Sequence, residues 1–307
     1  MINMIDNLRN KDVKSISRLI SKVENQEGNY LELLSDIYPY TGHAYRVGIT
    51  GPPGSGKSSL TDKLIEKIIN QKLSAAIIAI DPSSPFNGGA ILGDRIRFVN
   101  DFQNNDIFFR SMSTRGSQGG LTISANLVAD IFDACGYDII IFETVGVGQV
   151  EVDVVEAADT IIVTLVPESG DDIQMMKGGL MEIADLYVIN KSDRQGSDKL
   201  VTSLNKAIEI NEYEYWVPKI IKTVAISGQG VDELYNNMMK HKVFLSKNIV
   251  GKQKLDERYI KTVKSFISQS LIEEFWSNEI DKTLKKELSL EYQKRLSPYQ
   301  IAHKLLK

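Results

Sequence analysis

The sequence predicts an α/β fold built on a doubly wound, mostly parallel sheet with helical extensions at both ends. Three observations support this prediction. Short apolar runs alternate with stretches of helical spacing through the middle of the 307-residue chain. A glycine-rich loop separates the first of these runs from a helical stretch. Both terminal regions show helical spacing without a strand signal.

The central strands are predicted from short apolar runs that Gly, Pro or Asp residues bound. Runs of this kind are typical of parallel strands that are buried on both faces. We expect strands at Tyr45–Thr50, Ala75–Ile80, Ile107–Arg110, Ile139–Phe142, Thr160–Val166, Leu186–Ile189 and Ile220–Ile226.

Three zones follow from these patterns. Residues 1–44 carry apolar side chains at helical steps and are predicted to form an N-terminal helical extension. Residues 45–245 hold the predicted strands and form the central domain. Residues 246–307 carry an apolar stripe at helical spacing that ends in Phe275 and Trp276. Such a stripe packs either on the chain's own core or on another subunit, and both interpretations remain open at this point.

Composition narrows the class of protein. The formal net charge of -4 gives no reason to expect nucleic acid as a partner. One cysteine, Cys135, and three histidines argue against a disulfide framework and a multi-cysteine metal site. No apolar run approaches the roughly 20 residues that a membrane helix needs, and the first residues resemble neither a secretory signal nor a transit peptide. We therefore expect a cytoplasmic protein that does not bind a membrane.

A phosphate loop is predicted where the first strand meets the first central helix. Residues 51–58 read Gly-Pro-Pro-Gly-Ser-Gly-Lys-Ser and fit G-x-x-x-x-G-K-[ST] in full. Backbone N–H groups of such a loop turn toward phosphate oxygens, and the helix N-terminus adds its dipole. Lys57 is expected to reach the β- and γ-phosphates, and Ser58 to offer a hydroxyl to Mg²⁺. The expected nucleotide contacts of this segment are Gly51, Pro52, Pro53, Gly54, Ser55, Gly56, Lys57, Ser58 and Ser59.

A second motif favours guanine over adenine. Asn190-Lys-Ser-Asp193 fits N-K-x-D and follows the predicted strand Leu186–Ile189. Guanine presents two adjacent donors, N1–H and the exocyclic amine, and a carboxylate can accept both. Adenine has no such donor pair, so Asp193 is predicted to set the base specificity, with Asn190 and Lys191 beside it. A later segment is expected to contact guanine O6 through its backbone, at Val224, Ala225 and Ile226.

Acidic residues at strand ends are candidates for the Mg²⁺ sphere, because ligands of open α/β sheets bind at the carboxyl ends of the strands. Glu143 follows one strand and opens a Glu-Thr-Val-Gly segment in place of the D-x-x-G of other nucleotide switches. Asp81 follows another strand, whereas Asp138 precedes its strand and is expected at the opposite edge. Asp94 follows a glycine-rich segment that could close over the nucleotide.

The residues of GTP hydrolysis are predicted with less support from the pattern. Gln149 could orient the attacking water, and a contact made by a mobile loop is the alternative role. No arginine is obviously placed as an intrinsic finger, so we expect slow hydrolysis that a partner raises. The predicted catalytic residues are Lys57, Glu143, Gln149 and Asp94, and the predicted metal-side residues are Ser58, Asp81, Asp94 and Glu143.

These segments together resemble the MeaB/ArgK/MMAA family of P-loop GTPases. The resemblance covers nearly the whole chain and is most specific in the segments that begin at Asp81, Glu143 and Gly170. It implies a P-loop GTPase domain that binds GTP or GDP with Mg²⁺. It also implies a chaperone that gates cofactor loading and protects an adenosylcobalamin-dependent acyl-CoA mutase, typically methylmalonyl-CoA mutase.

The family pattern has two further implications, and this sequence departs from the pattern at Val224. It implies a homodimer joined through C-terminal helices, which would give the stripe that ends at Trp276 a partner. It also implies a mobile loop, matching Ser169 to Lys177, that relays the nucleotide state to the mutase. Val224 departs from the pattern, since a Ser often begins the guanine loop. The substitution removes a hydroxyl and keeps the backbone donors.

Three alternatives compete with this interpretation. A GTPase that inserts nickel or zinc needs soft or imidazole ligands, usually in paired Cys or His runs, and this chain has few of either. An ArgK-like kinase linked to basic amino-acid transport is expected to prefer ATP, which the segment Asn190–Asp193 disfavours. A scaffold without enzymatic activity is at odds with a complete phosphate loop.

Overall fold

The structure is a computed structural model that describes residues 2–81, 106–113, 120–144, 157–167, 180–276 and 278–306. The chain separates into two compact units, Met1–Lys254 and Leu255–Lys307. Within the described residues, no helix is long and apolar enough to cross a membrane.

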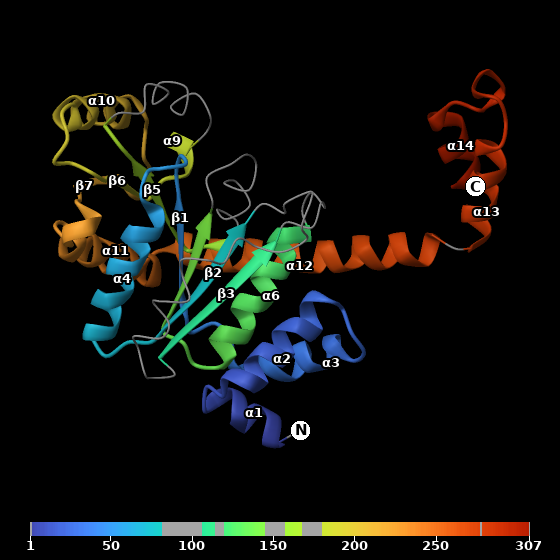
Figure 1. The fold of residues 1–307 in the computed structure, drawn as a ribbon, viewed down its shortest axis with the longest axis horizontal. Coiled ribbons are helices and arrows are strands. Elements are labelled where there is room, and N and C mark those ends of the chain that lie inside the picture. Colours follow the sequence, from blue (N-terminus) through green and yellow to red (C-terminus); the bar gives the residue numbers. More distant parts are fainter. Residues whose placement is uncertain are drawn as a thin grey trace. The chain divides into compact units, whose positions relative to one another are not determined.

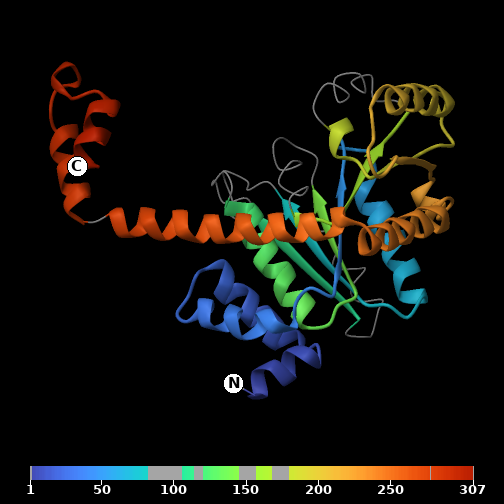
Figure 2. The ribbon, with the colours of Figure 1, turned by 180° about the vertical axis from the view of Figure 1, so that it is seen from behind.

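The first unit is built on a seven-stranded sheet with the order β3-β2-β4-β1-β5-β6-β7 (Figures 1 and 2). Every pair of neighbouring strands is parallel, which confirms the predicted α/β class. β2, β3 and β4 lie on one side of β1, and β5, β6 and β7 lie on the other, so a crevice for a ligand is expected at the carboxyl end of β1. The strands are β1 Tyr45–Thr50, β2 Ala75–Asp81, β3 Ile107–Ser113, β4 Ile139–Thr144, β5 Thr160–Leu165, β6 Leu186–Ile189 and β7 Lys219–Lys222.

The last predicted strand is wrong beyond Lys222. We expected a strand over Ile220–Ile226, but β7 ends at Lys222 and Ala225–Ser227 forms a 3₁₀ turn. The chain reverses here because the N–H of Val224 donates to the carbonyl of Gln229 at 3.0 Å. By contrast, β3 and β4 continue past their apolar runs, since their backbone pairing with β2 extends into polar residues.

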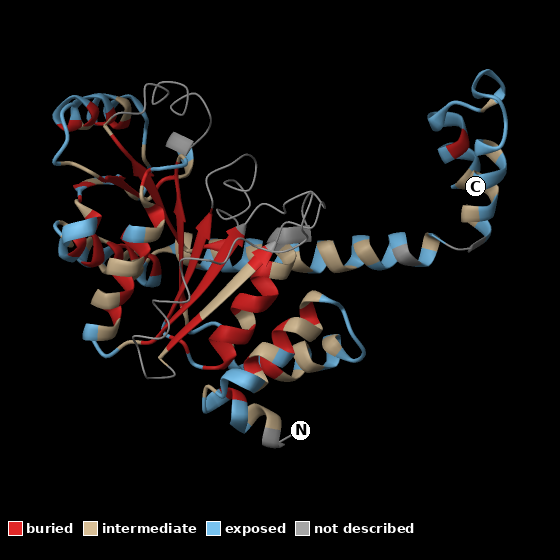
Figure 3. Cartoon of the chain, in the orientation of Figure 1, coloured by how far each residue is buried: buried red, intermediate tan, exposed pale blue. Residues whose placement is uncertain are grey.

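Helices cover both faces of the sheet, as Figure 1 shows. On one face lie α4 (Lys57–Asn70) and α11 (Val231–Lys247), and on the other lies α6 (Gly120–Ala134). α10 (Ser197–Ile210) packs beside β6 and β7, and the short α9 (Leu180–Ile183) precedes β6. The strands β1, β2, β4, β5 and β6 are therefore buried from both sides, as Figure 3 shows, and this burial explains their almost uninterrupted apolar sequences. The edge strands β3 and β7 are partly exposed.

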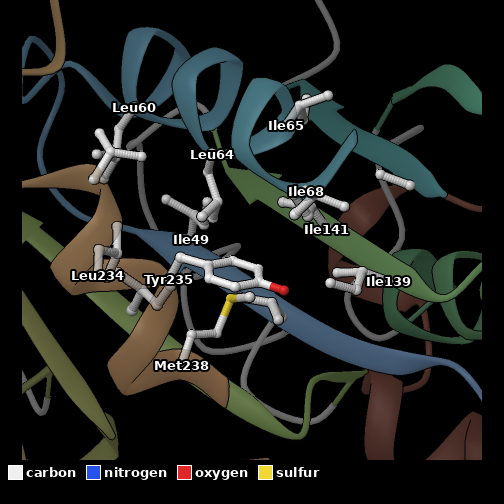
Figure 4. Close-up of a cluster of buried hydrophobic side chains, with 14 of the residues drawn as sticks. Ile49, Leu60, Leu64, Ile65, Ile68, Ile139, Ile141, Leu234, Tyr235 and Met238 are labelled. Atoms are coloured by element: carbon white, nitrogen blue, oxygen red, sulfur yellow. The ribbon is translucent and has the colours of Figure 1, made fainter. Parts of the chain in front are cut away.

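The main apolar cluster lies between the sheet and the two helices α4 and α11 (Figure 4). Leu64 and Ile68 of α4 meet Ile141 of β4, and Leu234 and Met238 of α11 close the cluster from the other side. These five side chains are fully buried. The cluster fixes the orientation of α4, and therefore the direction of the helix N-terminus at the phosphate loop.

The N-terminal extension is helical, as predicted. Its helices are α1 (Ile2–Arg9), α2 (Val13–Glu24) and α3 (Tyr30–Ile37), and the 3₁₀ turn Tyr38–Tyr40 follows them. α2 and α3 pack on α6, whereas α1 packs on α2. The stripe that α2 buries agrees with the helical spacing of the sequence and consists of Ile16, Leu19, Ile20 and Val23.

A buried carboxylate ties this extension to the sheet. Asp133, near the end of α6, accepts the backbone N–H groups of Gly42 (2.8 Å), His43 (3.1 Å) and Ala44 (2.9 Å). These residues lead directly into β1, so Asp133 fixes the path by which the chain enters the central strand. Asp138 lies just before β4, at the amino edge where it was expected, and accepts the N–H and the hydroxyl of Ser74.

The second unit consists of the greater part of α12 (Ile249–Phe275), followed by α13 (Asn278–Leu288), the 3₁₀ turn Tyr292–Lys294 and α14 (Pro298–Leu305). The absence of a strand signal in the sequence agrees with these described elements. Along α12 and at Trp276 directly after it, large apolar side chains lie exposed at helical spacing. They are Leu255, Tyr259, Ile260, Val263, Ile267, Leu271, Ile272 and Trp276.

A buried polar cluster lies at the amino edge of the sheet, far from the carboxyl ends of the strands. His241 of α11 is 1% exposed, and its Nδ1 lies 2.7 Å from the hydroxyl of Thr160. Its Nε2 lies 3.4 Å from a carboxylate oxygen of Asp185, and its ring packs on Trp216. Lys254 approaches the other oxygen of Asp185 at 3.5 Å. Burial lowers the pKa of His241 to about 4, against a smaller opposing effect of Asp185.

We predict that the neutral form of His241 makes stability fall in acid. The unfolded chain takes up this proton near pH 6.5, whereas the folded chain does so only near pH 4. Because the folded pKa is depressed, this contribution is present above about pH 6.5 and is lost as the pH falls toward 4. The expected loss is roughly 3 kcal/mol, measured as the free energy of urea unfolding across this pH range.

The variant His241→Asn removes the titrating group, so its unfolding free energy should show a shallower decline than that of the wild-type protein. His303→Asn changes an exposed histidine of α14 and serves as the matched control. Equal pH dependence in the wild-type protein and in His241→Asn would show that His241 is not held neutral.

Candidate functional site

The phosphate loop runs from the end of β1 to the start of α4, as the sequence predicted. Gly56 has a left-handed backbone with φ of 85°, and a Cβ at this position would lie 2.4 Å from Nδ2 of Asn190. A glycine is therefore required by both the conformation and the close approach of the neighbouring side chain. The first helical residue after it is Lys57, so the loop opens directly into a helix N-terminus.

The side chain of Lys57 is buried and folds back over the loop. Its Nζ donates to the carbonyl oxygens of Gly51 at 2.6 Å and of Pro52 at 2.9 Å. These bonds hold the ammonium group inside the ring of the phosphate loop, close to the N-terminus of α4. The contact of Lys57 with the β- and γ-phosphates stays a prediction.

The hydroxyl of Ser58 donates to Oε1 of Glu143 at 2.6 Å. Glu143 is 3% exposed and lies in β4, next to β1 in the sheet. A hydroxyl and a carboxylate held together are hard oxygen donors of the kind that Mg²⁺ prefers. Ser58 and Glu143 therefore offer side-chain oxygens that could hold a magnesium ion. Within the described residues, no group of three or more His, Cys, Asp or Glu side chains could hold a metal ion.

The other predicted acidic and hydrolytic residues lie at the margin of the described chain or beyond it. Asp81 is the last residue of β2, at the carboxyl edge of the sheet, and its side chain is outside the described residues. Asp94, Gln149 and the predicted mobile loop Ser169 to Lys177 also lie outside them. Among the predicted metal-side carboxylates, Glu143 is therefore the one whose side-chain surroundings the structure describes.

Asn190 connects the phosphate loop, the N-K-x-D turn and the turn after β7. It follows β6, is 2% exposed, and donates from Nδ2 to the carbonyl of Ser55 in the phosphate loop at 2.8 Å. Its Oδ1 accepts the hydroxyl of Thr223 at 3.1 Å and the N–H of Ala225 at 3.0 Å. Thr223 and Ala225 both donate to the amide oxygen, which therefore faces the turn after β7 that holds Val224, Ala225 and Ile226 and is called the base loop here. The amide nitrogen faces the phosphate loop. The sequence motif alone did not reveal this connecting role.

Lys191 and Asp193 follow Asn190 in the N-K-x-D turn and are less buried than Asn190. Lys191 has a left-handed φ of 54°, and its Nζ donates to the carbonyl of Gly54 at 2.9 Å. Its side chain therefore reaches from the end of β6 to the phosphate loop. Asp193 is exposed, two residues further along the turn. This leaves a carboxylate at the edge of the site, where an incoming base can be contacted.

The base loop is the turn that replaces the end of the last predicted strand. Thr223 is fully buried, and its carbonyl accepts the N–H of Ser192 at 3.0 Å. It thereby links the base loop to the N-K-x-D turn. This role was not predicted, although Thr223 and Lys222 are the two polar residues of the run Ile220–Ile226. The loop brings together the three predicted contact residues Val224, Ala225 and Ile226.

A phosphate loop and a guanine motif, joined by one asparagine at the carboxyl edge of a parallel sheet, define the class of P-loop GTPases. Comparison with known families gives the particular group. Residues 16–280 match the family model described as methylmalonyl-CoA mutase-associated GTPase MeaB. The chain belongs to this family and is a GTP-binding GTPase.

Individual relatives agree with the assignment. A Pyrococcus abyssi protein named as a GTPase is 42% identical over 99% of this chain and 95% of its own length. The GTPase ArgK of Escherichia coli is 32% identical over 90% of this chain and 86% of its own length. A solved structure described as an LAO/AO transport system kinase is 27% identical, with a TM-score of 0.71, and covers 99% of this chain and 96% of its own.

We predict that Lys57→Ala abolishes nucleotide binding while the protein stays folded. The variant removes the charged group that lies inside the phosphate loop, and hydrogen bonds to a charged group contribute about 1.5–3 kcal/mol each. The dissociation constant for GDP should therefore rise on the order of a hundredfold or more, measured by calorimetric titration. Lys63→Ala, which removes a partly buried ion pair with Glu66 on the same helix, is the matched control. An affinity of Lys57→Ala within a few-fold of wild type would refute the assignment of the loop.

Proposed function

We propose that this protein is a nucleotide-dependent chaperone of an adenosylcobalamin-dependent acyl-CoA mutase, with methylmalonyl-CoA mutase as the first candidate. In this role it gates cofactor loading and protects the mutase, and it uses GTP binding and slow GTP hydrolysis as the switch. Membership of the mutase-associated family supports the partner. The observation that carries the nucleotide part is the bonding of Asn190 to both the phosphate loop and the base loop.

The geometry of the site supports the nucleotide roles that we propose. The loop 51–59 binds the phosphates, with Lys57 on the β- and γ-phosphates. Asp193 reads the guanine edge beside Asn190 and Lys191, while the backbone of Val224–Ile226 faces guanine O6.

We assign Ser58, Asp81, Asp94 and Glu143 to the binding of Mg²⁺. When bound, Mg²⁺ neutralises charge on the phosphates during hydrolysis. Gln149 orients the attacking water in this proposal. The close pair of Ser58 and Glu143 supports the metal site, because both offer hard oxygen donors.

The proposal divides the chain into three functional segments. Residues 1–44 form the N-terminal helical extension, residues 45–245 form the GTPase domain, and residues 246–307 form a dimerisation arm. The exposed apolar side chains of α12 support the last assignment, since a helix seldom leaves so many large apolar side chains in water. A second copy of the chain presents the same stripe, and two such helices can bury each other.

We predict that Asp193→Asn changes the nucleotide preference from GTP to xanthosine triphosphate. The carboxylate accepts two donors of guanine, whereas the amide places a donor against the exocyclic amine of guanine. Xanthine has a carbonyl at that position and can accept from the amide. The loss for GTP should amount to roughly a hundredfold to several thousandfold in affinity, measured by competition among GTP, xanthosine triphosphate and ATP.

The same variant tests the chaperone role with purified methylmalonyl-CoA mutase. Its effect on adenosylcobalamin loading and on inactivation of the mutase should respond to xanthosine triphosphate and not to GTP, while the wild-type protein shows the reverse. The wild-type protein without nucleotide is the control. If neither protein alters mutase loading or inactivation with its preferred nucleotide, the chaperone role is wrong even though the GTPase assignment stands.

We predict that the chain is a homodimer and that Ile267→Asp makes it a monomer. Ile267 is exposed in the middle of the apolar stripe, so a charge there disrupts association without disturbing a buried core. Ser268→Asp changes an exposed neighbour on the same helix and serves as the control. Sedimentation at micromolar concentration measures the mass of each species. A wild-type monomer under these conditions would contradict the dimerisation arm.

A further inference from the structure

The chain between α10 and β7 holds three apolar side chains in water. Ile210, the last residue of α10, is 82% exposed, and Tyr215 and Val217 in the loop that follows are 50% and 48% exposed. All three lie in one short stretch of the sequence, and they contribute little to the core of the protein. Removing such side chains from water is favourable, so a partner that covers them gains affinity from this contact.

A tryptophan fixes the position of this loop. Trp216 is the residue between the two exposed loop side chains, and its Nε1 donates to the carbonyl of Asp185 at 2.9 Å. Its ring packs on His241 and Phe244, with ring centroids 4.5 Å and 5.1 Å away. The loop is therefore held on the body of the domain while the neighbours of Trp216 stay in water. A partner that binds them loses little free energy in ordering the loop.

The same stretch is acidic. Glu209, Glu212 and Glu214 are exposed, and residues 207–218 contain no Lys or Arg. The hydroxyl of Tyr215 donates to Glu214, which raises the pKa of Tyr215 and places a carboxylate beside an exposed ring. Residues 209–217, called the acidic loop here, thus combine apolar side chains with charges of one sign. Such a surface is complementary to a protein surface of the opposite charge.

The acidic loop lies at the edge of the sheet opposite the nucleotide site. α10 begins after the N-K-x-D turn, at the carboxyl edge, and the chain then enters β7 at the amino edge, because β7 runs parallel to β6. The length of the sheet therefore separates the acidic loop from the phosphate loop and the base loop. A partner can bind the acidic loop without covering the nucleotide.

We propose that the acidic loop is a docking surface for the acyl-CoA mutase, which meets it with a basic surface that also carries apolar side chains. The inference rests on the proposed mutase partner and names the side of the GTPase domain that this partner contacts. A second copy of the chain is disfavoured, because a symmetric contact would bring the glutamates of both copies together. The glutamates steer the encounter with the mutase, and the apolar side chains supply the lasting contact.

The test compares the binding of Tyr215→Ser and of the wild-type protein to purified methylmalonyl-CoA mutase by surface plasmon resonance. Each protein is saturated with GDP or with a non-hydrolysable GTP analogue. Tyr215→Ser should weaken mutase binding on the order of tenfold to a hundredfold, mainly through faster dissociation. Its affinity for GDP and its mass in sedimentation should equal those of the wild-type protein. Tyr38→Ser is the matched control, because Tyr38 is 56% exposed in the 3₁₀ turn of the N-terminal extension.

Glu212→Lys tests the charge of the loop. This variant should slow association with the mutase by about threefold to tenfold at low ionic strength. The difference from the wild-type protein should shrink as salt is added, because salt screens exposed charges. Glu27→Lys reverses an exposed charge of the N-terminal extension and should leave the association rate unchanged.

Wild-type mutase affinity in Tyr215→Ser would overturn the docking surface and leave the proposed function in place. Faster association of Glu212→Lys would also overturn it, since the surface that meets the loop would then not be basic. A lower mass of Tyr215→Ser than of the wild-type protein in sedimentation would assign the loop to a second copy of the chain and refute the inference. Lack of mutase binding by the wild-type protein would overturn the proposed partner together with this inference.

Discussion

The site depends on a single buried amide, the side chain of Asn190. Its nitrogen holds the phosphate loop at Ser55, and its oxygen holds the base loop at Thr223 and Ala225. A buried amide that loses a partner is left with an unsatisfied polar group, which costs about 1–3 kcal/mol. The two loops are therefore energetically linked before any ligand arrives. Gly56 completes this arrangement, because a side chain there would occupy the place of the Asn190 amide.

The sheet supplies the frame on which this amide acts. β1 and β4 end side by side and carry the phosphate loop and Glu143, whereas β6 ends at the residue before Asn190. Parallel strands place all their carboxyl ends on one edge, so residues far apart in sequence meet there without long connections. The buried apolar cluster between the sheet, α4 and α11 fixes the position of α4, whose first turn carries Lys57 and Ser58. The geometry of the site is thus a consequence of topology and core packing together.

Much of this arrangement was predictable from the sequence, and the exceptions have physical reasons. Apolar runs located β1 and β6 with their observed bounds, because buried parallel strands need apolar side chains on both faces. The same rule failed after Lys222, where the apolar residues Val224 and Ala225 belong to a turn and not to a strand. An apolar run indicates that its residues are buried, but it does not show whether the backbone continues as a strand or turns. The connecting role of Asn190 also could not be read from its motif, since it depends on partners 33 and 135 residues away in the sequence.

The residues of the site divide into a buried set and an exposed set, and the division has a consequence for binding. Glu143, Lys57, Asn190 and Thr223 are buried. Glu143 is bonded to the hydroxyl of Ser58, and the other three are bonded to one another or to the backbone. Asp193 and Ile226 are exposed at the rim. A ligand therefore meets a framework whose inner hydrogen bonds are already formed, and it loses little free energy in ordering that framework. The exposed residues are then the ones whose surroundings change most on binding. Substitutions among them should alter affinity and base choice without unfolding the chain. Loss of Asn190, in contrast, also removes the hydrogen bonds that join the two loops, so it should lower stability as well as affinity.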